Sequence, residues 1–290
     1  MKLSRLYNLA VELGSERDPR KKKGIKSYAD TAILNGKSDT GVNKVLVGID
    51  IEVGELLLAE RIRRREGLDL VLSHHPEGRA WAGFFRVMQL QINLLEKAGL
   101  SRQTAEQLVN ERIQEVERSV LPRNHMQAVD AARLLDIPLM CVHTPADNHA
   151  ADFIQGLLNT EKPKKLGDVV DILEQVPEYK EAKKDLFGPR VIIGNLKGPV
   201  GKVFVEMTGG TEGPKKAIKK LRASGVRTLI SMHLSEPHFK EVKDVGLNVV
   251  IAGHISSDTL GMNLLLDRIE KRSKQELQVI NCSGFRRIKR

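Results

Sequence analysis

Short apolar runs of strand length alternate with amphipathic stretches along most of this chain. The spacing predicts a helix over Val53–Glu66, where apolar residues recur every three or four positions between two apolar runs. Strands are predicted at 44–51, 68–73, 138–142, 190–193, 202–206, 228–232, 247–252 and 276–280. Further helices are predicted at 150–158, 169–174, 214–224, 237–245 and 259–271. Because parallel neighbours need a crossover between them, this alternation indicates an α/β protein with largely parallel sheets.

The stretch 80–136 contains three helical stripes and no strand candidate. The first stripe spans Phe84 to Leu95, and the second follows Ser101, whose hydroxyl is suited to cap a helix. The third begins at Pro122 and runs to Leu135. This helical insertion is too long for a simple crossover. Since its apolar stripes must be buried, we expect it to form a wall or lid of a site, or an oligomer contact.

The chain of 290 residues is long enough for two α/β domains, at about 100–200 residues per domain. We expect residues 1–158 and 262–290 to form the first domain, with residues 80–136 inserted in it, and residues 159–261 to form the second. A segment rich in lysine at 159–168 marks the passage between them.

The apolar content of 41% suits a globular protein. No run approaches the roughly 18–20 apolar residues that a membrane span needs, and the first residues do not resemble a secretory leader, so we expect a cytoplasmic protein. Cys141 and Cys282 are the two cysteines, and both lie in apolar runs outside any CxxC pair. This placement predicts buried, reduced thiols rather than a disulfide framework or a structural zinc site.

The formal charge of +10 suggests a small anionic partner. The lysines and arginines are spread over several runs with glutamates between them, however, which is also typical of a solvated surface. Aromatic residues make up 4% of the chain, and no aromatic RNA-binding motif accompanies the basic runs. Stacking on nucleic-acid bases is therefore disfavoured.

Histidines and aspartates follow three of the predicted strands. His74 and His75 end the strand at 68–73, and His143 with Asp147 follows the strand at 138–142. The strand at 247–252 leads into His254 and Asp258. In α/β proteins ligands bind outside the carboxyl ends of the strands, so we expect these side chains to meet in the cleft between the two domains.

Imidazoles and carboxylates without a thiolate favour a catalytic metal centre that holds zinc, iron, manganese or nickel. Side chains of adjacent residues tend to point apart, so His74 and His75 can each serve a different ion, and Asp147 or Asp258 can bridge the two ions. The alternative is that the histidine pair only ends a strand. For His143, direct ligation and a role in orienting a ligand both fit its position four residues before Asp147.

Four other histidines have weaker claims. His233 and His238 follow the strand at 228–232 and are candidates for proton transfer in the site, although hydrogen-bonded loop histidines fit the pattern equally well. His125 and His149 are expected on the surface.

A glycine-rich loop lies between the strand at 202–206 and the helix at 214–224. Its candidate anion-binding residues are Gly209, Gly210, Thr211 and Lys215. Glycines let backbone N–H groups approach an anion, and a helix amino terminus favours negative charge. The loop lacks the spacing of a P-loop or a dinucleotide fingerprint, so a simple tight turn is the alternative.

The order of these motifs, from the strand at 44–51 to Asp258, resembles the Nif-three-like family, whose members are also described as type-two GTP cyclohydrolase I. The resemblance implies a two-metal centre between two α/β domains and a ring-shaped hexamer. It implies metal ligands at His74, His75, Asp147, His254 and Asp258. The family usually has glutamate where this chain has Asp258. Since the aspartate arm is one methylene shorter, we expect one of the two ions to be more labile than the other.

The function expected from this pattern is that of a metal-dependent hydrolase. Two divalent ions per subunit would activate water for attack on GTP, another small nucleotide or a phosphorylated metabolite. We expect a homo-oligomer. The alternative is a non-catalytic metal-binding protein with a regulatory or scaffold role.

Overall fold

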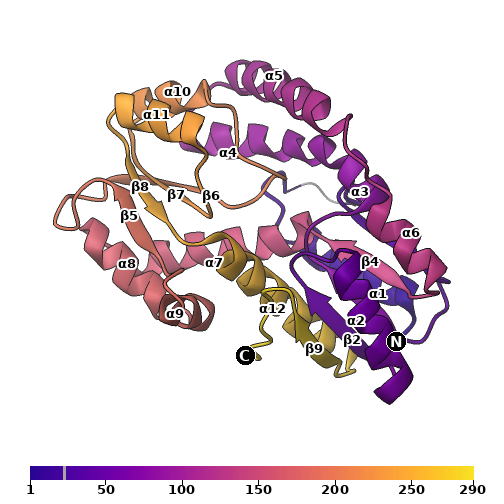
Figure 1. Ribbon diagram of the computed structural model, residues 1–290. Coiled ribbons are helices and arrows are strands. Elements are labelled where there is room, and N and C mark those ends of the chain that lie inside the picture. The colour runs from indigo at the N-terminus through magenta and orange to yellow at the C-terminus, as the bar shows by residue number, and fades with distance from the viewer. Residues whose placement is uncertain (22–23) are drawn as a thin grey trace.

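A computed structural model describes residues 1–21 and 24–290, and two largely parallel sheets organise it (Figure 1). The strands of the first sheet are β1 (Thr31–Asn35), β2 (Lys44–Gly48), β3 (Leu70–Ser73), β4 (Leu139–Val142) and β9 (Gln278–Cys282). Their spatial order is β1-β4-β3-β2-β9, and all neighbours are parallel except β1 with β4.

The second sheet repeats this plan on a smaller scale. Its strands are β5 (Arg190–Ile193), β6 (Lys202–Glu206), β7 (Val226–Ser231) and β8 (Asn248–Ile251). The order is β5-β8-β7-β6, and only the edge strand β5 runs antiparallel to its neighbour. The α/β class with largely parallel pairing is therefore confirmed.

Helices cover both faces of the first sheet. One face packs against α1 (Leu3–Ser15) and the carboxyl-terminal half of α12 (His254–Ser273). The other face packs against α2 (Val53–Glu66) and α6 (Gln127–Leu134), while the short α3 (Gly78–Ala82) lies beside β1. The strands read as continuous apolar runs because both of their faces are buried.

The second sheet is also buried on both faces. One face packs against α7 (Thr144–Glu161), α8 (Leu166–Glu174) and α9 (Pro177–Lys184). The other face packs against α4 (Leu90–Ala98), α5 (Arg102–Val120), α10 (Ala217–Ala223) and α11 (Glu236–Asp244). A 3-10 turn at Phe84–Gln89 leads into α4. Within the described ranges, none of these helices has the length and apolar character needed to cross a bilayer.

Residues 80–136 divide between the two sheets. The apolar stripes of α4 and α5 join the core around the second sheet, whereas α6 joins the core of the first. The hydroxyl of Ser101 caps α5 by accepting a hydrogen bond from the Thr104 backbone N–H at 3.2 Å, as its position predicted. Helices α4 and α5 of the insertion thus join α10 and α11 in covering one face of the second sheet, while α6 covers the first.

Helices α7 and α12 pack against each other and join the two sheets. Ala146 of α7 belongs to the core of the first sheet, and Ile154 further along belongs to the second. Helix α12 does the reverse, with Leu260 in the second core and Met262 in the first. At the crossing the backbones touch, because a Cβ added at Gly261 would lie 2.5 Å from the carbonyl oxygen of Ala146.

Several elements escaped the sequence pattern. Helices α1 and α9 and strand β1 were not predicted, and Pro122 lies in a turn five residues before α6 begins at Gln127. Strand β1 is a short edge strand that pairs antiparallel, three of its five residues are only partly buried, and its apolar run is limited to residues 32–34. Helix α1 lacks a side-chain hydrogen bond at its N-cap residue Lys2 and so has no capping signal.

Three local predictions of exposure differ from the structure. His149 is 1% exposed rather than on the surface, because its ring tucks back to place Nδ1 2.8 Å from the carbonyl of Pro145. Cys282 is half-buried, whereas Cys141 is buried as expected, and both thiols are free. His125 is half-buried with its ring edge-on to Trp81, so it too is only partly at the surface.

We predict that Gly261→Ala destabilises the fold by about 1–3 kcal/mol, the usual cost of overpacking, because the added methyl meets backbone that cannot rotate away. Gly156→Ala on α7 is the matched control: no atom lies within 4 Å of its added Cβ. That control should be neutral or stabilising by up to about 1 kcal/mol. Urea unfolding of both variants measures the difference, and equal midpoints would contradict the close crossing.

Candidate metal centre

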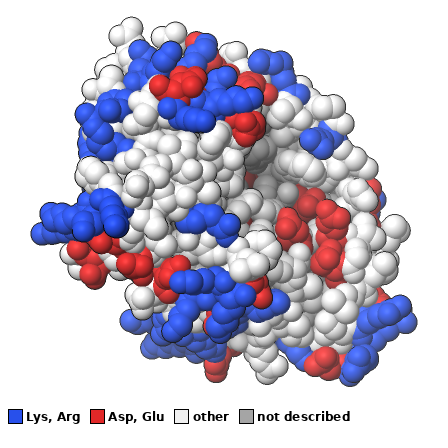
Figure 2. Space-filling model, turned by 60° about the vertical axis from the view of Figure 1, so that its left-hand side comes forward, with Lys and Arg blue, Asp and Glu red and all other residues white. Residues whose placement is uncertain are grey.

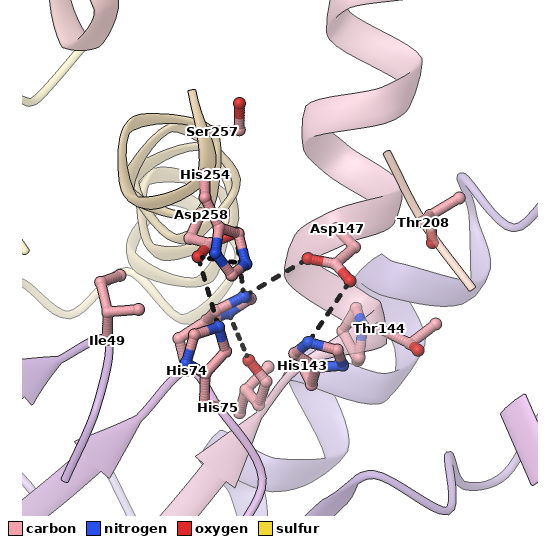
Figure 3. A network of polar contacts seen from close by, with 12 residues as sticks. Ile49, His74, His75, His143, Thr144, Asp147, Thr208, His254, Ser257 and Asp258 are labelled. Carbon is pink, nitrogen blue, oxygen red and sulfur yellow. Dashed lines mark hydrogen bonds and ion pairs between the residues drawn. The ribbon is translucent and has the colours of Figure 1, made fainter. Parts of the chain in front are cut away.

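The six His and Asp residues of the three sequence motifs meet where β3 and β4 end and α7 and α12 begin (Figure 3). The β2–β3 ladder continues past the strand, since the backbone N–H groups of His74 and His75 donate to Gly48 and Ile49 at 2.9 Å each. The chain bends at these two residues, so both rings face the cluster, with their centroids 5.2 Å apart. Asp147 and Asp258 lie one helical turn beyond His143 and His254, on the same helix faces.

Two groups of donors share one carboxylate. In the first group, His74 Nε2 lies 3.4 Å from Asp147 Oδ1 and 3.4 Å from Asp258 Oδ1. In the second group, the other oxygen of Asp258 lies 3.4 Å from His75 Nε2 and 3.5 Å from His254 Nε2. The two oxygens of Asp258 therefore face different groups, and the short aspartate arm spans both.

The donor spacing fits divalent cations. Two atoms bound about 2.1 Å from a tetrahedral ion lie about 3.4 Å apart, which is the separation within both groups. Three buried atoms of the cluster also have no hydrogen-bond partner among the described residues: His74 Nε2, Asp147 Oδ1 and Asp258 Oδ2. Buried polar atoms without partners are costly, so their presence in both donor groups indicates that cations satisfy them.

Hydrogen bonds behind the rings fix the imidazoles with Nε2 toward the cluster. Nδ1 of His74 donates to the Val142 carbonyl at 3.1 Å, so Nε2 is the nitrogen that faces the cluster. Nδ1 of His75 lies 2.6 Å from Asp50 Oδ1. A carboxylate or carbonyl behind a ligating histidine typically sets its tautomer and raises its basicity.

Asp50 and Asp30 were missed from the sequence. Asp50 ends the apolar run at 44–51 and so obeyed the same strand-end rule as the chosen residues. Asp30 precedes the unpredicted strand β1, and its Oδ2 lies 2.9 Å from His143 Nδ1 and accepts the Thr144 hydroxyl at 2.6 Å. His143 Nε2 then lies 3.7 Å from Asp147 Oδ2, a position that suits direct ligation and orientation of Asp147 alike.

Electrostatics in the cluster are strongly coupled. Burial alone would lower the pKa of His74, yet the Asp258 and Asp147 carboxylates raise it to about 10. Burial opposes the charged form of His75 too, but Asp258 and Asp50 raise its pKa to about 9. Although burial alone would raise the pKa of Asp258, the facing imidazoles hold it well below its usual range. The carboxylates therefore favour protonated imidazole rings when no metal ion is bound.

A small cavity of about 50 Å³ adjoins the cluster and is bounded by the glycine-rich loop and the end of β7. His233 lines it, with its ring centroid 4.6 Å from that of His254. Its Nδ1 lies 3.7 Å from Glu212 Oε1, and this nearby carboxylate raises the pKa of His233. Glu212, which the sequence pattern did not single out, is a carboxylate at the turn after the two glycines.

The other candidates are divided between two places. His238 lies in the first turn of α11 and is buried outside this cavity, with Nε2 2.9 Å from the Gly213 carbonyl. Its Nδ1 lies 2.9 Å from the Ser235 hydroxyl and 3.3 Å from Glu212 Oε2, so its ring is held by hydrogen bonds and by the carboxylate that also faces His233. Gly210 and Thr211 line the metal cavity, whereas Lys215 lines a separate cleft beside α5.

Hydrogen bonds from α4 of the inserted segment hold the glycine-rich loop in place. The side chain of Gln91 donates hydrogen bonds to the carbonyls of Gly209 at 2.9 Å and Thr211 at 2.7 Å. Gly209 and Gly210 adopt φ values of +106° and +86°, in the left-handed region that favours glycine. Gln91 thus holds this loop against α4. Because Lys215 lies in a different cleft from Gly210 and Thr211, the four predicted anion-binding residues do not form one pocket.

Comparisons with known proteins agree with this geometry. A sequence profile described as Duf34/NIF3 (NGG1p interacting factor 3) matches residues 113–284. Curated protein sequences give no match. Among solved structures, the NIF3 superfamily protein from Sphaerobacter thermophilus is 26% identical over 96% of this chain and 97% of its own, with a TM-score of 0.76.

More distant relatives share the fold. Reduced HcgD from Methanocaldococcus jannaschii is 19% identical over 97% of each chain, with a TM-score of 0.55. TTHA1606 from Thermus thermophilus is 15% identical over 97% of each chain, with a TM-score of 0.53. The whole chain therefore has counterparts of the same architecture.

We predict that the double variant His74→Ala plus Asp147→Ala loses one of about two bound ions, because both residues belong to the same donor group. Metal analysis of protein purified without added metal gives the ratio per subunit. His125→Ala is the control outside the cluster and should retain full occupancy. Full occupancy in the double variant would contradict the assignment.

We also predict that metal binding releases protons at pH 7. The raised pKa values of His74 and His75, about 10 and about 9, mean that both rings are protonated in the metal-free protein and must lose a proton to bind. The affinity of the protein for the metal ion should therefore rise with pH between 7 and 9, by about tenfold per pH unit for each proton displaced. Calorimetry in buffers of different ionisation enthalpy counts the protons, and binding without release would overturn the prediction.

Proposed function

The chain belongs to the Duf34/NIF3 family, as the order of its His and Asp motifs predicted, and on that premise we propose that it is a metal-dependent hydrolase with a dinuclear centre. Its substrate is GTP, another small nucleotide or a phosphorylated metabolite. We place this activity in the cytoplasm.

The position of Asp258 carries the proposal. Its carboxylate is 1% exposed, and each oxygen faces a different group of His and Asp donors. A buried carboxylate shared in this way suits a bridge between two cations, whereas a single ion would leave one donor group unused. The absence of cysteine from both groups favours a catalytic rather than a structural centre.

Divalent ions held there would supply a water of lowered pKa and an electrophile for the attacked atom. His74 and Asp147 would hold one ion, and His75 with His254 the other. His233 lines the adjoining cavity, so its ring is placed to take a proton from the attacking water or to give one to the leaving group. Glu212 orients that ring from behind.

Substrate access follows from the sizes of the two cavities. The cavity of about 50 Å³ beside the cluster holds at most a few water molecules. A cleft of about 690 Å³ on the other side of His233 and His254 has the volume of a typical small-molecule site. We therefore assign the body of the substrate to this cleft and the reacting atom to the boundary formed by the two histidines.

The charge distribution supports a small anionic substrate rather than nucleic acid. On the face that Figure 2 shows, Lys and Arg form separate clusters with Asp and Glu among them, not one continuous basic surface. A nucleic-acid site usually needs a basic stripe that follows the phosphate backbone.

We also propose a homo-oligomer. Leu57 and Leu58 of α2 and Leu134 of α6 are 51%, 47% and 84% exposed on neighbouring helices. Contact with a second subunit would bury such leucines. Sedimentation of the unmodified protein tests this assembly, and a monomeric mass would reject it.

Glu212→Gln and His233→Gln should lower kcat by about a hundredfold, the usual contribution of a positioned proton-transfer group, without loss of bound metal. The assay uses GTP, other nucleotides and phosphodiesters, with His125→Gln as the control that keeps activity. A metal-loaded protein that turns over none of these substrates would reject the hydrolase and favour a non-catalytic regulatory or scaffold role.

A further inference from the structure

The cleft of about 690 Å³ carries features that the metal chemistry does not use. It lies between the segment after α9, the first turns of α12 and the chain after β9. Two of these features are a set of exposed apolar side chains and a set of polar groups without partners. Together they specify a ligand.

One wall of the cleft is apolar although it faces solvent. Leu186, Phe187 and Ile255 are 81%, 72% and 38% exposed, and all three line the cleft. Large apolar side chains that converge on one concave surface mark a binding site more than a random exposure does. Phe187 supplies a ring face on which a planar group can stack.

The first turns of α12, which also carry Ile255, hold polar groups without hydrogen-bond partners among the described residues. Helix α12 is 20 residues long and begins at this cleft, and its N-cap residue Gly253 provides no side-chain cap. Ser256 and Thr259 are 9% and 4% exposed, line the cleft, and have hydroxyls without a hydrogen-bond partner in the described part of the chain. Free N–H groups and free hydroxyls at a helix start suit an anionic oxygen.

Two arginines add positive charge to the cleft. Arg190 and Arg286 line the cleft, and neither is within ion-pair distance of a carboxylate among residues 1–21 and 24–290. Their neighbours Arg287 and Arg290 are instead engaged by Asp267 and Glu178.

Most carboxylates that line the cleft are paired with other residues and do not neutralise Arg190 and Arg286. Glu178 pairs with Arg290, and Glu181 pairs with Lys184. Asp185 is the wall carboxylate without an ion pair to a described residue.

Arg190 donates to the carbonyls of Leu186 and Gly188, and Arg286 donates to that of Phe285, so both guanidinium groups keep their full charge. Two guanidinium groups without an ion pair, against one such carboxylate, leave a net positive charge in the cleft.

We propose that this cleft binds a small molecule made of an anionic group and a planar or apolar body. The anionic group, a phosphate, sulfonate or carboxylate, lies at the first turn of α12 between Arg190 and Arg286, and the body lies against Phe187 and Ile255. The binding site stands on its own. The further statement that its occupant is the substrate rests on the proposed function, because His254 belongs to both the cleft and the metal cluster.

The test uses 8-anilinonaphthalene-1-sulfonate, which combines a sulfonate with a planar apolar body, and titrates its fluorescence on the full-length protein. We expect saturable binding, competition by inorganic phosphate, and weakening at high salt. The double variant Arg190→Gln plus Arg286→Gln should bind at least tenfold more weakly, as expected for loss of charge-assisted hydrogen bonds. Arg61→Gln removes an exposed arginine elsewhere and should bind normally. Equal affinity in the double variant would overturn the proposal.

Two further variants separate the parts of the site. Phe187→Ala should weaken the dye but leave phosphate competition intact, whereas Thr259→Val should weaken phosphate more than the dye. If Phe187→Ala instead lowers the sedimenting mass and the unmodified protein does not bind the dye, the apolar wall is a subunit contact and the proposal fails.

Metal content and turnover measured on the same samples keep this result distinct from the proposed function. Dye binding without hydrolysis rejects only the hydrolase, and hydrolysis without dye binding rejects only the anion site.

Discussion

The close crossing of α7 and α12 is the constraint on which the rest of the structure depends. Both helices begin directly after a strand, one from each sheet, and each carries a carboxylate in its first two turns. Their backbones meet at Ala146 and Gly261, next to Asp147 and Asp258. This contact fixes the two sheets relative to each other and brings both carboxylates within 3.4 Å of one imidazole nitrogen, His74 Nε2.

That arrangement has an electrostatic cost that metal ions are suited to offset. Asp147 and Asp258 are 5% and 1% exposed, and carboxylates so deeply buried lose most of their hydration. Without a cation, the imidazoles must carry protons to balance them, which is why the pKa of His74 rises to about 10 despite burial of its ring. Bound cations would replace those protons and stabilise the folded chain by mass action.

Parts of this structure follow from the sequence, and others depend on contacts that no local pattern records. The buried parallel strands and the strand-end motifs at His74 and Asp258 were predictable, because apolar runs and their carboxyl ends obey general rules. Strand β1 has an apolar run of three residues only and was not predicted, so Asp30, which precedes it, was missed as well. The expectation that the short arm of Asp258 leaves one ion more labile than the other stays a prediction, while the two oxygens of Asp258 face different donor groups.

The first turns of α12 serve two purposes because a helix presents different faces at different residues. His254 and Asp258 are four residues apart and share the face toward the metal cluster, whereas Ile255 and Thr259, also four apart, line the broad cleft. One rigid element therefore holds the donor groups and shapes the neighbouring surface. A chain that changes residues 255 and 259 can alter what the cleft accepts while its donors stay in place, since the donors are fixed by the crossing with α7 and not by the cleft.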